Sequence, residues 1–195
     1  MQQVRPVLLA GLAASLGVAA MVYMVVEYRK ATRNLLMIDK NPAFTHHDPR
    51  TKKIRGIVVH HTVTGNPKIT ERVLQQRGFS THFEVAQDGT VIRYLDPATY
   101  VAWASNWAND RAIAVDVTHL SHAAWPAVQV EAVARLVADL RAQFPGIPAG
   151  VAPDGVQYAS WAEVPAGVGV LRHRNVHATE CPQDFPMARL GPVAG

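Results

Sequence analysis

The sequence predicts an α/β fold in which helices cover a sheet, preceded by one N-terminal transmembrane helix. Three observations lead to this prediction: short runs rich in β-branched residues, one long segment with helical periodicity, and an uncharged apolar stretch near the N-terminus. Once the apolar stretch is set aside, about 140 residues remain, which is the usual size of one domain. Hydrophobic residues make up 49% of the chain and charged residues 17%, a composition that excludes a disordered or coiled-coil chain.

The apolar stretch, residues 7–26, contains no charged side chain. Twenty helical residues rise about 30 Å, which is the thickness of the hydrocarbon core of a bilayer. A cleaved signal peptide and a buried core helix are the alternatives. The run is longer than a typical signal core, however, and residues 27–30 carry charges in place of a small-residue cleavage site. We therefore expect an uncleaved membrane anchor within residues 1–30 that crosses the lipid bilayer through residues 7–26.

Three small residues in this stretch lie at four-residue spacing, so they share one face of the expected helix: Gly11, Ser15 and Ala19. Such a face permits the close approach of a second helix. We therefore expect self-association through the transmembrane helix.

The next segment, residues 31–53, shows no sustained helical or strand period and includes the polar run 46–50. It is expected to be a tether. No internal repeat follows it, and residues 54–190 are expected to form a single module.

The first half of the module contains one strand, one helix and one hairpin. The β-branched run 54–59 is too short for a helix and suits a buried strand, with the polar residues 60–62 at its C-terminal end. A helix is expected over residues 68–76, ended by Gly78. Residues 83–94 are expected to form a hairpin around a glycine-containing turn.

The second half continues the alternation of strands and helices. A third core strand is expected over residues 112–117, with Asp116 within it. Apolar residues then follow the helical period from Pro126 to Phe144. A short strand over residues 168–171 leads into His173. In α/β sheets, polar groups that end such strands gather at one edge.

The charge of the chain is concentrated in its N-terminal part. Residues 1–55 carry a net charge of +6, whereas the remainder carries −2. A nucleic-acid-binding domain carries its positive charge on the folded surface that follows the phosphates. We therefore expect no nucleic-acid partner.

The densest polar chemistry lies in residues 173–182. Cys181 is the single cysteine of the chain, so it cannot form an internal disulfide. His173 and His177 have the spacing of histidines on one helix face, but Arg174 stands where a zincin motif needs its basic glutamate. A second grouping joins His173 and Cys181 to a histidine from the end of the first strand, and a third interpretation is a buried structural cysteine. The spacing within this segment alone leaves these alternatives open.

The order of motifs along the module helps to distinguish these three interpretations of residues 173–182. These motifs are VVHHT at 58–62, THF at 81–83 followed by DGT at 88–90, and the closing segment from HRNV to TECP at 173–182. In this order they resemble the zinc-dependent N-acetylmuramoyl-L-alanine amidases of the peptidoglycan-recognition and phage lysozyme-amidase type, over about residues 54–186.

The resemblance implies a fold, a metal and a reaction. The fold is a central mixed β-sheet flanked by helices, and the implied Zn²⁺ ligands are His60, His173 and Cys181. The reaction is hydrolysis of the amide between the lactyl group of N-acetylmuramic acid and L-alanine, so residues 54–190 become an amidase-like catalytic domain with peptidoglycan as its partner. Asp116 stands where one branch of the family has a glutamate near the metal, which makes it the candidate general base. Thr179 is the candidate donor to the tetrahedral oxyanion.

These implications lead to one preferred biological role and two alternatives. The preferred role is a membrane-anchored, phage-type lytic enzyme, similar to an endolysin with a signal anchor. A noncatalytic peptidoglycan-binding receptor and a virion component that opens the cell wall are the alternatives. Positive charge after the anchor favours a cytoplasmic C-terminal module. Access to the cell wall requires the opposite, so we expect a single-pass protein of the bacterial inner membrane with its catalytic domain in the periplasm.

Overall fold

The computed structural model describes residues 35–120 and 123–194. The expected transmembrane segment and its small-residue face lie outside these residues. Among the described residues, no helix has the length and apolar character needed to cross a membrane. A compact unit begins at Leu36.

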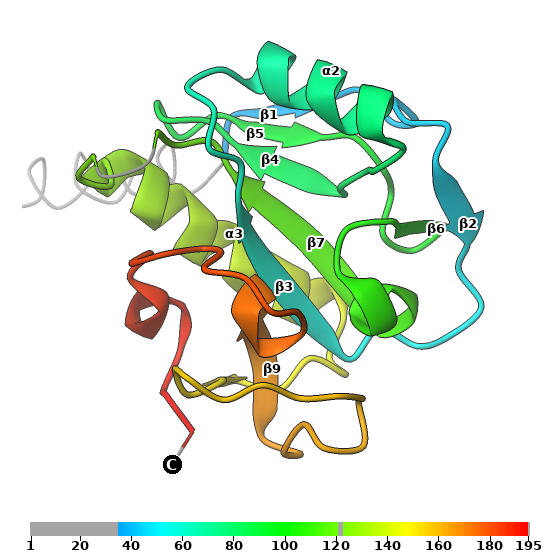
Figure 1. Ribbon diagram of the computed structural model, residues 1–195, viewed down its shortest axis with the longest axis vertical. Helices are drawn as coiled ribbons and strands as arrows, with labels where there is room; N and C mark the ends of the chain where they lie inside the picture. Colours follow the sequence, from blue (N-terminus) through cyan, green and yellow to red (C-terminus); the bar gives the residue numbers. More distant parts are fainter. Residues whose placement is uncertain (1–34, 121–122, 195) are drawn as a thin grey trace, which may run out of the picture. The chain divides into compact units, whose positions relative to one another are not determined.

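The described chain contains a seven-stranded mixed sheet in the order β1-β5-β4-β7-β3-β9-β8 (Figure 1). β4 and β5 are antiparallel, and the other neighbouring strands are parallel. This confirms the central mixed sheet. The strands are β1 (Met37–Asp39), β3 (Gly56–His61), β4 (Phe83–Val85), β5 (Val91–Arg93), β7 (Ala112–Val117), β8 (Gly150–Val151) and β9 (Val168–Arg172).

The centre of the sheet is formed by β3 and β7, in which every residue is buried. Both strands are rich in valine and isoleucine, as expected for parallel strands covered on both faces. Their register pairs His60 with Asp116, and β4 places Glu84 on the other side of Asp116. β3 also extends beyond the expected strand end, so His60 and His61 lie within the strand. Three polar side chains thereby occupy neighbouring strands at one level of the sheet.

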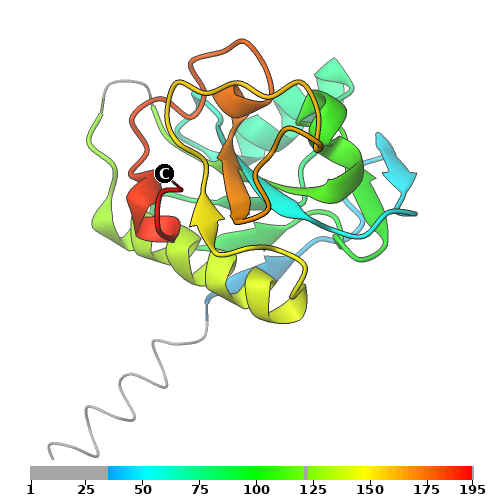
Figure 2. The same cartoon turned by 90° about the horizontal axis from the view of Figure 1, so that it is seen from below.

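Two helices flank the sheet on opposite faces (Figures 1 and 2). α2 (Pro67–Arg77) begins after Asn66, whose side chain accepts a hydrogen bond from the Lys68 amide. It ends at Gly78, which has a φ of 70° in the left-handed region that glycine adopts without strain. α3 (Ala127–Gln143) buries the apolar face that its periodicity predicts.

The segment expected to be a tether contributes to the folded unit. β1 joins the edge of the main sheet, and β2 (His47–Pro49) pairs antiparallel with β6 (Tyr100–Ala102). Phe44 is only 2% exposed and packs in an apolar cluster with Tyr94. The folded unit therefore begins earlier than residue 54. Strands of three residues at a sheet edge show too little alternation to be recognised in a sequence.

Three short 3₁₀ helices complete the described elements: η1 (Asn106–Arg111), η2 (His173–Asn175) and η3 (Met187–Leu190). η2 follows β9 directly, so His173 lies next to the C-terminal end of the central strands.

Candidate metal centre

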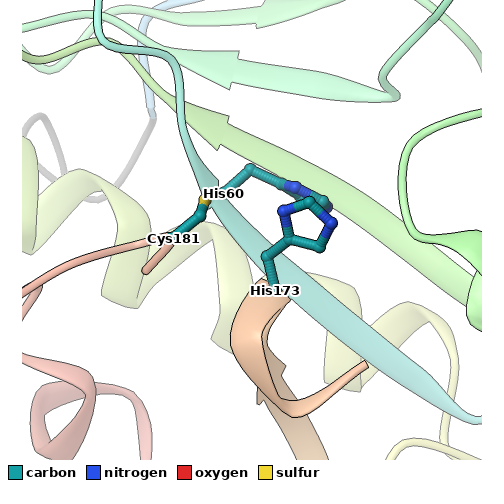
Figure 3. Close-up of side chains that lie close together, drawn as sticks. All are labelled: His60, His173 and Cys181. Carbon is teal, nitrogen blue, oxygen red and sulfur yellow. The ribbon is translucent and has the colours of Figure 1, made fainter. Parts of the chain in front are cut away.

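Three side chains from distant parts of the sequence meet at the C-terminal end of β3. They are His60, His173 and Cys181, and Figure 3 shows these side chains close together. One ligand atom from each lies within 4.8 Å of the other two. No other group of three or more potential metal ligands among the described residues lies close enough together to hold one metal ion.

His60 is held by the sheet and by one hydroxyl group. Its side chain is 6% exposed, and its Nε2 lies 2.9 Å from the Ser105 Oγ. When Nε2–H donates to this hydroxyl, Nδ1 keeps its lone pair for a metal. A hydrogen bond from the second ring nitrogen is the usual way in which proteins orient a ligating histidine.

His173 and Cys181 belong to one irregular segment that hydrogen bonds close into a loop. The Arg174 amide donates to the Cys181 carbonyl at 2.8 Å. The buried Asn175 side chain accepts from the Arg172 amide at 2.8 Å and donates to the Val156 carbonyl at 2.5 Å. These bonds bring the two ligands together without a regular element.

The protonation of this group suits a cation. Burial lowers the pKa of His60 well below its usual value and lowers the pKa of His173 to about 4, so both imidazoles are neutral and can coordinate. Burial raises the pKa of the Cys181 thiol to about 12, although the His61 amide donates to its Sγ at 3.0 Å. A bound cation would favour the thiolate. Two neutral imidazoles and one thiol form a donor set that Zn²⁺ prefers.

His177 stands outside this group. Its ring stacks on His173 with centroids 5.6 Å apart, but His173 lies in a 3₁₀ turn, so the two residues do not share an α-helix face. The zincin-type grouping therefore lacks the helix that it requires.

Asp116 lies beside His60 in the sheet register and is 5% exposed. Burial raises the pKa of Asp116 well above its usual value, and the neighbouring Glu84 raises it further. Thr179 accepts a hydrogen bond from the Cys181 amide at 3.3 Å through its Oγ1, which leaves its own proton available. Both candidate catalytic residues thus adjoin the three potential ligands.

A hollow of about 620 Å³ opens beside the three ligands and is lined by all five predicted site residues and by α2. A second hollow of about 480 Å³ is lined by Trp107 and Tyr158. Asn106 and His177 border both hollows. The candidate metal centre therefore lies near the meeting point of two recesses.

The family of this chain follows from a comparison of its sequence with models of known protein families. A family model described as N-acetylmuramoyl-L-alanine amidase matches residues 50–184, which is more than half of the chain. The chain belongs to the N-acetylmuramoyl-L-alanine amidase family. The match confirms the resemblance. It also confirms the enzyme class, because an N-acetylmuramoyl-L-alanine amidase is a peptidoglycan hydrolase.

Solved structures with the same fold as the amidase come from three kinds of protein. The N-acetylmuramoyl-L-alanine amidase LysC from Clostridium intestinale URNW is 23% identical, with a TM-score of 0.59 over 79% of this chain and 93% of that chain. The Ph2119 endolysin from Thermus scotoductus MAT2119 bacteriophage Ph2119 is 18% identical, with a TM-score of 0.58 over 80% and 99%. Drosophila peptidoglycan recognition protein SA is 15% identical, with a TM-score of 0.54 over 78% and 88%. At these identities the likeness establishes the fold. No curated protein gives a significant match.

Two residues of the amidase site escaped the sequence analysis. Ser105, which contacts His60, lies in a segment without a recognisable motif. Glu84 is fully buried in β4 and lies next to Asp116 of β7 in the strand register. A charged residue between Phe83 and Val85 in an apolar strand was a usable signal, since glutamate is rarely buried without a partner.

Proposed function

We propose that this amidase is a zinc-dependent hydrolase that cleaves the bond between the lactyl carbonyl of N-acetylmuramic acid and L-alanine of the stem peptide. The observation that carries the proposal is the convergence of His60, His173 and Cys181 within 4.8 Å at the edge of a hollow. These three residues would hold Zn²⁺. Bound Zn²⁺ supplies a Lewis acid that polarises a carbonyl group and makes water nucleophilic near neutral pH.

The protein's own side chains handle the proton and the developing charge. Asp116 faces the hollow, and its carboxylate would accept the proton of the attacking water. The Thr179 hydroxyl, whose oxygen already accepts from the Cys181 amide, would donate a hydrogen bond to the carbonyl oxygen as that oxygen becomes negative. The leaving amine of L-alanine then takes up the proton that Asp116 accepted.

The two hollows fit a substrate that extends in both directions from the cleaved bond. The larger one, of about 620 Å³, has the volume of a ligand pocket. The second offers the partly buried Trp107 ring and the carboxylate of Glu163. Aromatic rings with nearby polar groups are suited to bind sugars. We infer that the stem peptide occupies the larger hollow and the glycan the second.

The noncatalytic receptor is the less favoured function, because its binding role needs no third metal ligand and this chain retains Cys181. We further propose a phage-type lytic enzyme that is anchored in the bacterial inner membrane through residues 7–26, with its catalytic domain in the periplasm. The length and apolar character of that segment support the anchor, and access to peptidoglycan supports the orientation. A virion component that opens the wall remains the alternative role.

The test uses the purified full chain and isolated peptidoglycan. We expect about one Zn²⁺ per chain and release of stem peptides with new L-alanine N-termini, lost on treatment with a chelator and restored by Zn²⁺. Release of reducing sugar ends without new N-termini would identify a glycosidase and contradict the proposal.

A further inference from the structure

The Ser105 hydroxyl, which contacts the potential ligand His60, lies in a loop with an unusual backbone. Ser105 is 1% exposed, and its Oγ lies 2.9 Å from the His60 Nε2. It lies between β6 and η1, outside any strand. The next residue, Asn106, has a φ of 54°, in the left-handed region that few residues other than glycine adopt. Contacts other than a strand ladder must therefore hold this hydroxyl in place.

Those contacts come from one side chain four residues further along. The Asn109 Oδ1 accepts a hydrogen bond from the Ala104 amide at 3.1 Å and another from the Ser105 amide at 2.5 Å. A side-chain amide oxygen has two lone pairs, so both are used, and the Asn109 Nδ2 could not replace it as an acceptor. The Ser105 carbonyl accepts from the Ala108 amide at 3.1 Å. The backbone of Ser105 is thus held at both its N–H and its carbonyl group.

The direction of the Ser105 hydroxyl depends on this arrangement. Without the Asn109 oxygen, the amide of the buried Ser105 would lose its acceptor, and the loop would turn to find a new one. The Oγ is one rotatable bond away from that backbone, so it would move with the loop. Hydrogen bonds weaken steeply as their angle departs from linearity. Because the β3 register fixes only the backbone of His60, its ring would then lose the contact that orients it.

We propose that Asn109 is a positioning residue for the metal centre: it fixes Ser105, and Ser105 holds the His60 ring with Nδ1 directed toward the metal. The inference rests on the proposed function, because that function requires Zn²⁺ at His60. Loss of a group that hydrogen-bonds to a ligating side chain typically lowers metal affinity tenfold to a hundredfold. Asn109 lies one hydrogen bond further out and controls the same contribution through Ser105.

The experiment measures the Zn²⁺ affinity of the full chain in a double-mutant cycle. Ser105→Ala removes the acceptor that His60 uses, and Asn109→Leu removes the oxygen that holds the two loop amides. Each change is expected to lower Zn²⁺ affinity by about tenfold. The double variant should also lose about tenfold, not about a hundredfold, because both changes remove the same contact with His60.

A spectroscopic measurement separates positioning from a structural role. Co²⁺ in place of Zn²⁺ gives a visible absorption spectrum that depends on the arrangement of the ligands. Asn109→Leu and Ser105→Ala should change this spectrum in the same way. Asn109→Asp keeps an oxygen acceptor on a side chain of the same shape and should restore both the spectrum and the affinity. Asn41→Leu is the matched control, because the Asn41 Oδ1 accepts the Asp96 amide at 2.7 Å in a loop that does not line the hollow.

Three results would overturn the inference and leave the proposed function intact. They are an unchanged Zn²⁺ affinity in Asn109→Leu, losses that multiply in the double variant, and an Asn109→Asp protein that behaves like Asn109→Leu. If Asn109→Leu does not fold, Asn109→Gln, whose oxygen is displaced by one methylene, takes its place in the cycle. Wild-type protein that binds no Zn²⁺ would overturn both the function and the inference. Zinc affinities that follow the expected cycle, without release of stem peptides, would overturn the proposed function alone.

Discussion

The candidate metal centre joins two regions of different construction. The strand side comprises β3, β4 and β7, which carry His60, Glu84 and Asp116 in a continuous hydrogen-bonded register. The loop side comprises residues 173–181, which carry the other two ligands without a long helix or strand. Strand register places side chains through many backbone bonds, whereas a loop depends on a few individual contacts. The sheet side thus carries one potential ligand and the candidate general base, whereas the loop side carries two potential ligands and the candidate oxyanion donor, Thr179.

Cys181→Ser should have the largest effect, because it acts on the loop side and removes a ligand. A serine hydroxyl stays protonated at neutral pH, unlike a metal-bound thiol. Mutation of residues that only hydrogen-bond to a metal ligand lowers metal affinity by up to about a hundredfold. Because Cys181→Ser removes a ligand itself, we expect zinc affinity and activity to fall by at least about a hundredfold. Zinc content and peptide release measure it, with His177→Ala as the matched control. Zinc loss in His177→Ala, together with zinc retention in Cys181→Ser, would favour the other grouping.

Asp116→Asn tests the strand side. An amide cannot accept the proton of the attacking water, and loss of a general base costs about a hundredfold or more in kcat. Zinc content should stay near that of the wild type, because the ligands are other residues. Asp139→Asn on the exposed face of α3 controls for a change of charge. Equal loss of zinc and activity would show that Asp116 belongs to the metal ligands and that the two sides are not separable in this way.

Asn175→Ala should affect stability more than chemistry. Its buried side chain satisfies the Arg172 amide and the Val156 carbonyl, and each group left unpaired costs about 1 kcal/mol or more. We expect the free energy of unfolding in urea, measured without zinc, to fall by about 2–3 kcal/mol. Gln76→Ala, an exposed amide on α2, is the control. An unchanged free energy would mean that the loop does not depend on this residue.

The effect that is smallest within one pH unit is a pH dependence on the strand side. His82 accepts the Ala114 amide through Nδ1, and burial, followed by the charge of Arg50, lowers the pKa of His82 to about 3. Between about pH 6.5 and pH 3 the unfolded chain therefore binds a proton that the folded chain does not. Stability is fully present above this range and falls with decreasing pH by at most about 1.4 kcal/mol per unit. His60 and His173 act in the same direction, so the measured quantity is the difference in slope between wild type and His82→Asn. Parallel slopes would contradict the prediction.

The sequence contained much of this site but little of its support. His60, His173 and Cys181 could be grouped because their motifs occur in a recognisable order, and Asp116 because it interrupts an apolar strand. Ser105 and Thr70 could not be connected to the site, since the histidine that Ser105 contacts and the hollow that Thr70 lines depend on how the sheet brings distant segments together. A hydroxyl in a sequence shows neither its direction nor its neighbour.

The fold likewise contains some elements that the sequence predicts and others that it does not. The strands β3 and β7 and the helix α3 have periodic apolar residues and were predicted within a few positions. β1 and β2 have three residues each, which is too short for a recognisable alternation of apolar and polar residues. Whether their side chains are buried depends only on the segments that pack beside them. The membrane anchor, its self-association and the periplasmic location stay predictions, since they concern residues 1–34 and the cell.

The edge position of β1 has a mechanical consequence. Any tension carried by the chain before residue 36 enters the fold at β1, which is held by a three-residue parallel ladder to β5. Along the sheet, β5, β4 and β7 lie between that point and β3. A pulling force would therefore peel a short outer strand before it reached the strand that carries His60. We therefore expect a moderate pulling force to detach β1 while the strand that carries His60 keeps its pairing with β7.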